Sequence, residues 1–280
     1  MEQKTTKRII LSCAVLLVIA CICLGVIVVG GVGVSLAWPL QSPIRESQIP
    51  DDGALPELSS ELPEDLAKTL YQIETQVIAI RGLELKRPVD RTLISPAELK
   101  NIVEEDFFAD YSDEDARQDV VILSLLGLLP ENFDLKSLYQ DLYSEQIAGF
   151  YDDELEKIYV VQGESFGGSE KLTYAHEFTH VLQDQVYDLS DGLGLNQESC
   201  EEDSERCAAV RALIEGDATK TEILWFQTYA TLKDYRDIQR FFSDFSSPVF
   251  ETAPPYIAAD LGFPYEKGLA FVEHLYDQNG

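Results

Sequence analysis

Apolar residues recur three or four positions apart after residue 64, and the repeat is carried by Leu66, Leu70, Ile73, Val77 and Ile80. This spacing predicts the buried face of a helix. Further on, Ser95-Pro96-Ala97-Glu98 is typical of a helix start, with Ser as N-cap and Pro at the first helical position. We therefore predict helical structure from 64 to about 109, with further helices over 113–126 and 135–146.

The hydrophobic period then changes. Residues 147–151 and 157–161 are rich in β-branched and aromatic residues and flank an acidic turn at 152–156, which predicts a β-hairpin. After a loop at 163–169, Ser169 can cap a helix from 170 to about 187. A second long helix is predicted from 203 or 204 to about 231, and a last one from about 266 to 276. Prolines predict turns before this last helix, at 248, 254, 255 and 264.

Mainly helical patterns with one hairpin predict an α+β fold with a small sheet. An uncharged run over 9–38 precedes these elements, and Lys4, Lys7 and Arg8 precede the run. Its length and flank predict a transmembrane anchor, with residues 1–8 in the cytoplasm and the rest outside. Residues 39–63 are rich in Pro, Ser, Asp and Glu and predict a flexible linker.

Two other interpretations of the N-terminus stay open. Ser35-Leu36-Ala37 resembles a signal-peptidase site, and cleavage after Ala37 would release a secreted domain. The stretch ending at Cys21 loosely resembles a lipoprotein cleavage site, although the apolar run continues well beyond Cys21. An uncleaved anchor accounts for the length of the run best.

Charge excludes one class of partner. The chain has 50 acidic and 21 basic residues, for a net charge of -29. Phosphate backbones are repelled by such a surface, so we expect no nucleic acid partner. Acidity of this kind keeps a domain soluble and does not by itself identify a substrate.

The five cysteines divide according to this topology. Cys13, Cys21 and Cys23 lie in the apolar run, where cysteine behaves as a small apolar residue. Cys200 and Cys207 form an even pair in a compartment that permits disulfides, and we predict that they are bonded. A four-thiolate zinc site would need more cysteines than the part after residue 38 contains.

Two of the three histidines lie four residues apart, in His176-Glu177-Phe178-Thr179-His180. On a helix this spacing places both imidazoles on one face, where they can bind the same metal ion. Glu177 projects beside that face and can act as a general base. Random placement gives a four-residue spacing with a probability of about 0.02. The motif therefore predicts a zinc site.

A catalytic zinc needs a third protein ligand and an open position. A metzincin would have a third His at position 186, which is Val186 here. The best candidate is Glu215, followed by Gly216, whose lack of a side chain suggests a close approach to the helix that carries the histidines. The alternative for Glu215 is an ion pair with Arg211. Other carboxylates are poorer candidates: Glu201, Glu202, Glu205 and Glu222.

These residues resemble the gluzincin group of zinc peptidases, particularly bacterial members with one N-terminal membrane helix. The resemblance covers residues 120–280 and rests on 175–185, on Glu215-Gly216-Asp217-Ala218 and, less specifically, on 263–268. It implies a zincin-like domain over 147–280, preceded by a helical part over 64–146. It also implies Zn held by His176, His180 and Glu215, with Glu177 as base and the hairpin edge available to an extended peptide.

The chain departs from the family pattern in two places. Thr219 stands where an Asp would orient the first His, so Asp217 or another group must take that role. The residue that stabilises the oxyanion has three candidates, Tyr229, Tyr265 and His274. Similar chains continue beyond the position of Gly280, which predicts a domain that is incomplete at its C-terminus.

The expected function is zinc-dependent hydrolysis of peptide bonds by a metallo-endopeptidase outside the cytoplasmic membrane. Its expected partners are a peptide or protein substrate and, through the N-terminal helix, the membrane. One alternative is a non-catalytic, membrane-tethered zinc-binding protein, and another is a zinc hydrolase acting on a non-peptide amide. Glu177 favours catalysis, because a purely structural metal site does not need it.

Overall fold

The computed structural model describes residues 62–108, 111–162 and 166–279. No helix in these ranges is long and apolar enough to cross a membrane. The predictions for residues 1–8, for the transmembrane anchor at 9–38 and for nearly all of the linker at 39–63 lie outside the described residues.

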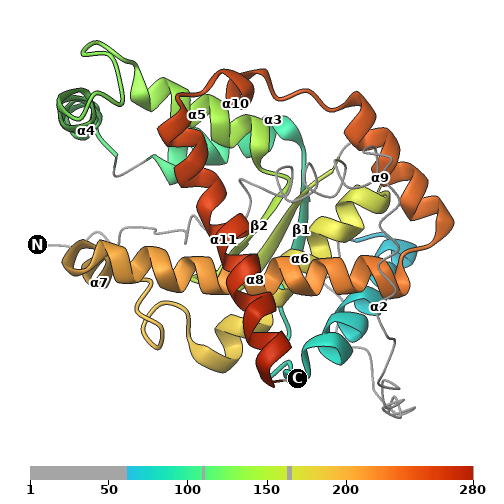
Figure 1. Ribbon diagram of the computed structural model, residues 1–280. Helices are drawn as coiled ribbons and strands as arrows, with labels where there is room; N and C mark the ends of the chain where they lie inside the picture. The colour runs from blue at the N-terminus through green and yellow to red at the C-terminus, as the bar shows by residue number, and fades with distance from the viewer. Residues whose placement is uncertain (1–61, 109–110, 163–165, 280) are drawn as a thin grey trace, which may run out of the picture.

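Three strands form the sheet, in the order β1-β3-β2. The hairpin strands β2 (Gly149–Asp152) and β3 (Lys157–Val161) are antiparallel, and β1 (Asp90–Ile94) pairs with β3 in parallel. The small sheet among many helices confirms the mainly helical α+β fold (Figure 1). The prediction of helix through 82–94 was wrong. Helix α2 ends at a left-handed Gly82, and residues 90–94 gain a full ladder of strand pairing with β3, which local periodicity cannot reveal.

The helices of the first part otherwise follow the predicted pattern. They are α2 (Glu64–Arg81), α3 (Pro96–Ile102), the π-helix η1 (Val103–Phe107), α4 (Asp113–Leu125) and α5 (Leu135–Gln146). The start of α3 is confirmed: the Ser95 side chain accepts from the Glu98 amide, and the Glu98 carboxylate accepts from the Ser95 amide. The reciprocal bonds satisfy amides that would lack helical partners.

The second part contains α6 (Gly168–Tyr187), α7 (Gln197–Glu202), α8 (Ser204–Tyr229), α9 (Leu232–Asp244), α10 (Pro248–Thr252) and α11 (Pro255–Asn279). Ser169 is not the N-cap of α6. Gly167 takes that position, and its amide donates to the Glu170 carboxylate. Pro264 was also wrongly predicted as a turn, since it lies within α11, at the cost of one helical hydrogen bond.

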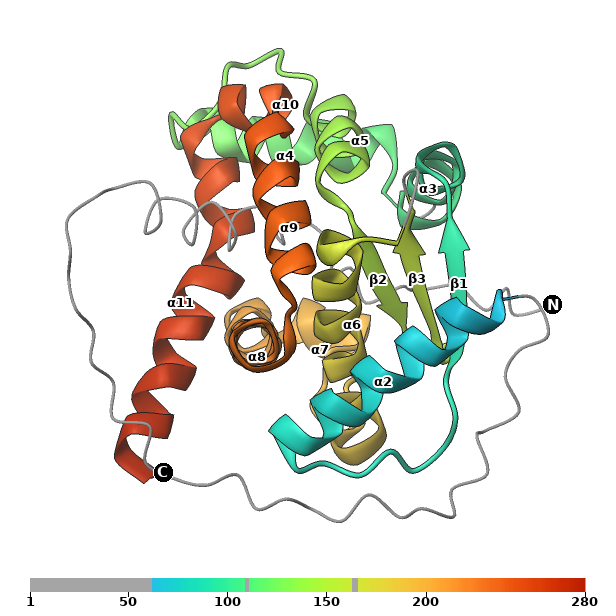
Figure 2. The same cartoon turned by 90° about the vertical axis from the view of Figure 1, so that its right-hand side faces the viewer.

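Helix α6 lies at the centre of the molecule, in contact with α2, α8, α9 and β2 (Figure 2). Its side chains from Leu172 to Gln185 are buried. The largest core cluster joins α2, the sheet, α6 and α8 and includes Leu70, Val77, Ile158, Phe178 and Trp225. This core and the sheet therefore connect residues 64–146 with residues 147–280, and they hold α6 rigidly.

A buried ion pair fixes α6 close to the histidine motif. Glu74 of α2 is 2% exposed and accepts a hydrogen bond from Arg91 of β1 at 2.8 Å. The Tyr174 hydroxyl of α6 donates to the same carboxylate. Charges are rarely buried unless they are paired, so the three groups lock two helices and a strand in one arrangement, two residues before His176.

Helices α8 and α11 cross at two glycines. A Cβ atom at Gly216 would overlap the carbonyl group of Gly268, and one at Gly268 would overlap the carbonyl oxygen of Ala212. The close approach of Gly216 is therefore to α11. Helix α8 also packs against the histidine helix α6, as predicted, but the neighbour that requires glycine at 216 is α11, because sequence identifies a crowded position without the neighbour that crowds it.

Gly216→Ala is expected to lower the free energy of unfolding by about 1–3 kcal/mol or more, because the added methyl group meets backbone that cannot rotate away. Urea unfolding of the purified protein measures this loss. Gly262→Ala, also in a helix, is the matched control: its Cβ would meet only the end of the Glu266 side chain, at 3.7 Å. It should be neutral or stabilising by up to about 1 kcal/mol. Equal stability of the two variants would contradict the crossing described above.

Cys200 of α7 and Cys207 of α8 are joined by a disulfide. Cys207 lies in the first turn of α8 and is 5% exposed. The bond ties the short helix α7 to the helix that carries Glu215.

Candidate metal centre

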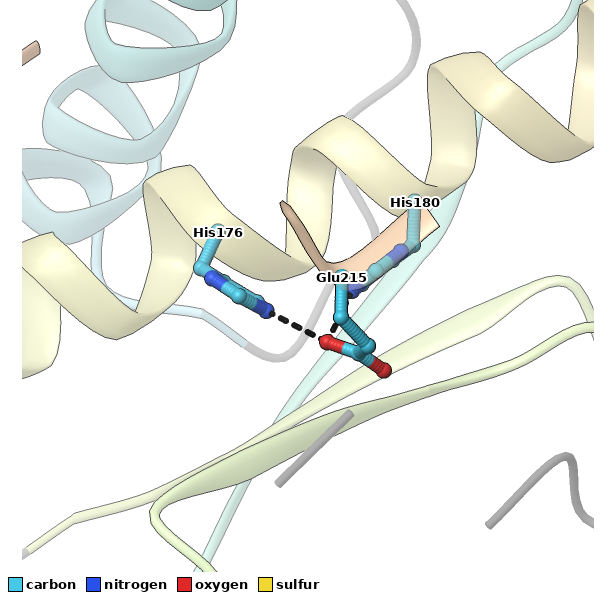
Figure 3. Close-up of side chains that lie close together, drawn as sticks. All are labelled: His176, His180 and Glu215. Carbon is cyan, nitrogen blue, oxygen red and sulfur yellow. Dashed lines mark hydrogen bonds and ion pairs between the residues drawn. The ribbon is translucent and has the colours of Figure 1, made fainter. Parts of the chain in front are cut away.

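Three side chains from α6 and α8 converge in the interior. His176 and His180 lie one turn apart on α6, with exposures of 1% and 0%, and Glu215 of α8 is also 0% exposed. One ligand atom from each lies within 4.8 Å of the others. The three side chains point toward one another (Figure 3). Among the described residues this is the one group of three or more His, Cys, Asp or Glu residues that could hold a metal ion.

The distances within this cluster fit a metal ion. Glu215 Oε2 lies 3.3 Å from His176 Nε2 and 3.6 Å from His180 Nε2. Two ligands of a tetrahedral zinc ion lie about 3.4 Å apart. His180 Nε2 and Glu215 Oε1 are buried without a hydrogen-bond partner, which costs stability unless another group binds them. A metal ion between the three side chains would satisfy both atoms.

Glu222 orients the first histidine. Its Oε2 lies 3.0 Å from His176 Nδ1, and its side chain is 1% exposed. This contact leaves Nε2 as the nitrogen that faces the cluster, a common arrangement behind a metal-binding His. Sequence reasoning considered Glu222 only as a poor ligand and missed this role. The available signal was the spacing of seven residues from Glu215, which places both carboxylates on one helix face.

Gln183 orients the second histidine, His180. Its Oε1 lies 2.8 Å from His180 Nδ1, and its Nε2 donates to Asp217 Oδ2 at 2.8 Å. Asp217 also forms an ion pair with Arg81. Asp217, predicted to orient the first histidine, therefore supports the second one through Gln183. Sequence reasoning missed Gln183.

Three buried carboxylates meet two imidazoles here. Burial alone lowers the pKa of His176, but the hydrogen bonds that its ring donates to Glu215 and Glu222 outweigh burial and raise that pKa to about 10. Burial raises the pKa of Glu222. Burial also favours a higher pKa for Glu215, but the charge of His180 and the hydrogen bond to His176 outweigh it, so the pKa of Glu215 is lowered. A cluster with this excess of carboxylates is balanced better by a divalent cation than by protons.

Glu177 is the third carboxylate. It is 0% exposed, and both of its carboxylate oxygens are buried without a side-chain hydrogen-bond partner. Burial raises its pKa well above the ordinary value, and the charge of His176 and the backbone amide of Tyr151 offset this only in part. Glu177 lies beside the first residue of β2, since a Cβ atom at Gly149 would be 3.5 Å from Glu177 Cγ. An acid without a side-chain hydrogen-bond partner thus lies between the cluster and the sheet edge.

The candidates for the oxyanion-stabilising residue lie in different places. Tyr265 is 3% exposed, and its ring stacks on that of His176 with centroids 6.3 Å apart. Tyr229 packs against the main core cluster at the end of α8. His274 is exposed and contacts Gln278 on the surface of α11, so its predicted catalytic role is not supported. Thr219 is buried with an unpartnered hydroxyl.

Comparisons of the chain with protein-family models, with curated proteins and with solved structures find no match.

Glu222→Ala is expected to weaken zinc binding by about 10- to 100-fold, because His176 loses the group that orients it. Competition with a chromophoric chelator measures the dissociation constant. Glu222→Gln should lie between this variant and the wild type, since the amide oxygen can still accept. Glu205→Ala, an exposed position on the same helix, is the control and should bind zinc normally. Wild-type affinity in Glu222→Ala would show that the contact does not support the metal.

Proposed function

We propose that this chain is a zinc-dependent metallopeptidase with a zincin-like active site. The observation that carries the proposal is the buried cluster of His176, His180 and Glu215 with the unpaired acid Glu177 beside it. Structural zinc sites usually have four protein ligands, whereas catalytic sites have three and keep one position open. Three ligands and a neighbouring acid are typical of catalysis.

A zinc ion in this centre would act as a Lewis acid that polarises an amide carbonyl and makes water acidic near neutral pH. Glu177 would accept one proton from the attacking water as the new C–O bond forms. It would then deliver that proton to the leaving amine as the C–N bond breaks. Its position beside the cluster, with neither carboxylate oxygen held by another side chain, suits a group that both accepts and donates a proton.

The outer edge of β2, on the side away from β3, would hold the peptide. β2 is an edge strand of the sheet, and Ala148 accepts a backbone hydrogen bond from Val161 of β3. The backbone alternation of an antiparallel pair then directs the polar groups of Gly149 and Tyr151 away from β3. An extended peptide can pair with such an edge, and this edge runs beside Glu177. Tyr265, next to His176, is the best-placed candidate for stabilising the oxyanion.

The expected location of the domain is outside the cytoplasmic membrane. The disulfide between Cys200 and Cys207 supports this proposal, because such bonds persist in oxidising compartments. The anchor predicted over 9–38 would keep the domain at the membrane, and cleavage near Ala37 would instead secrete it. The proposed partner is a peptide or protein substrate.

Hydrolysis of a mixed peptide library by the purified full chain in detergent tests this function. The proposal predicts new peptide termini that disappear after treatment with a zinc chelator and return when zinc is added. Zinc bound in stoichiometric amounts without any cleavage would favour the alternative, a non-catalytic zinc-binding protein. Cleavage that survives complete removal of the metal would contradict both.

A further inference from the structure

Arg211 has an unusual environment for an arginine in so acidic a chain. It lies on α8 one turn before Glu215, its Nε is buried without a hydrogen-bond partner, and its side chain is half-buried. Glu215, the carboxylate that sequence reasoning offered as an alternative partner, faces the histidines instead. Among the described residues the Arg211 guanidinium forms no ion pair within 4.0 Å.

The neighbours of Arg211 place it beside the proposed substrate path. Its charge acts on Tyr143 of α5 and on Asp260 of α11. Tyr143 lies six residues before Gly149, where β2 begins, and it packs with Phe150 and Tyr265 in one cluster. Tyr265 in turn stacks on His176. Arg211 therefore lies one turn from Glu215 of the candidate metal centre, next to the point where α11 crosses α8, and its charge reaches α5.

The charge of Arg211 is only partly balanced there. Asp260 is exposed by its accessible surface, although burial raises its pKa, and the structure shows no ion pair within 4.0 Å between Asp260 and Arg211. A guanidinium out of bulk water is costly unless it is paired, and a carboxylate is the group that matches its five donors best. Residues one turn apart on a helix have Cβ atoms about 5–6 Å apart. A substrate carboxylate bound by Arg211 would therefore belong to a residue close to the scissile peptide bond, which would lie at the metal centre beside Glu215.

We propose that Arg211 is a specificity-determining residue that binds a carboxylate of the peptide substrate near the scissile bond. This inference rests on the proposed function and adds a substrate class to it. The carboxylate has two sources, an acidic side chain or the free C-terminus of the peptide. Arg211 acts on substrate choice and takes no part in the proton transfers.

The test compares zinc-loaded full chains carrying wild-type Arg211, Arg211→Met and Arg211→Lys. The substrates are peptides that the wild-type chain hydrolyses, prepared in matched forms. One pair has Glu or Gln beside the cleavage site, and the other has a free or an amidated C-terminus. For the form that carries the recognised carboxylate, Arg211→Met should lower kcat/KM by about 10- to 100-fold, mainly through KM. For the uncharged form it should change kcat/KM by less than about threefold. Arg211→Lys should recover part of the loss, because it keeps the charge without the bidentate geometry.

Binding provides a readout independent of turnover. In a Glu177→Gln background, fluorescence anisotropy of the labelled peptide should show the same carboxylate preference, and Arg211→Met should abolish it. Lys220→Met, on the same helix, is the control and should keep the wild-type preference. Wild-type preference retained in Arg211→Met would overturn this inference and leave the peptidase proposal standing. Absence of cleavage by the zinc-loaded wild type would overturn both.

Discussion

Glu177→Gln is expected to lower kcat for peptide hydrolysis by about 10²- to 10⁴-fold, while the protein still folds and binds zinc. The amide has the same shape as the carboxylate but cannot accept the proton from the attacking water. Glu177 forms no hydrogen bond to Glu222 or Gln183, the two groups that orient the histidines. Its replacement should therefore leave the ligand geometry intact. Initial rates with a cleaved peptide, together with metal analysis, measure both quantities.

The matched control is Glu202→Gln, which makes the same chemical change at an exposed position of α7. It should retain wild-type kcat. Undiminished hydrolysis by Glu177→Gln would remove the general base from the mechanism. Loss of both zinc and activity in that variant would instead assign Glu177 to the metal site.

His180→Ala and Glu215→Ala should each weaken zinc binding more strongly than the loss of an orienting group does. Losing an orienting group weakens metal binding by about 10- to 100-fold. Each variant leaves two protein ligands, and Glu215→Ala also leaves the histidines without their shared carboxylate. A ligand that binds only the folded state stabilises it, by about 2.7 kcal/mol at a hundred times its dissociation constant. Thermal unfolding with and without zinc should therefore show a shift in Tm for the wild type and almost none for these variants.

His274→Ala is the control for the histidine substitution. His274 is exposed on α11 and contacts Gln278, so the variant should keep the full zinc-dependent shift. A wild-type shift in His180→Ala would mean that zinc binds elsewhere on the chain.

The sequence predicted those parts of the fold that depend on local chemistry. The capping box at Ser95, the extents of α4 and α5 and the hairpin follow from patterns within a few residues. It failed where distant segments decide the structure. The strand at 90–94 exists because it pairs with β3, and Pro264 stays helical within the long helix α11.

The candidate site shows the same division. A spacing of four residues within one helix predicted that His176 and His180 would meet, and Glu215 joins them from α8. The residues that orient them were missed, because Glu222 and Gln183 act through contacts that depend on the packing of α6 against α8. Gly216 was recognised as a crowded position, but its neighbour is Gly268 of α11. Sequence spacing identifies ligands on one helix better than it identifies partners between helices.

We propose that His176, His180 and Glu215 together hold one zinc ion. The most direct test is the metal content of the purified, folded full chain, measured by elemental mass spectrometry. The variants His180→Ala and Glu215→Ala are measured in parallel. We predict about one zinc per wild-type chain and a sharp reduction in both variants. A correctly folded wild-type chain that contains no zinc and takes up none on addition would contradict the account, and so would variants that retain the full complement.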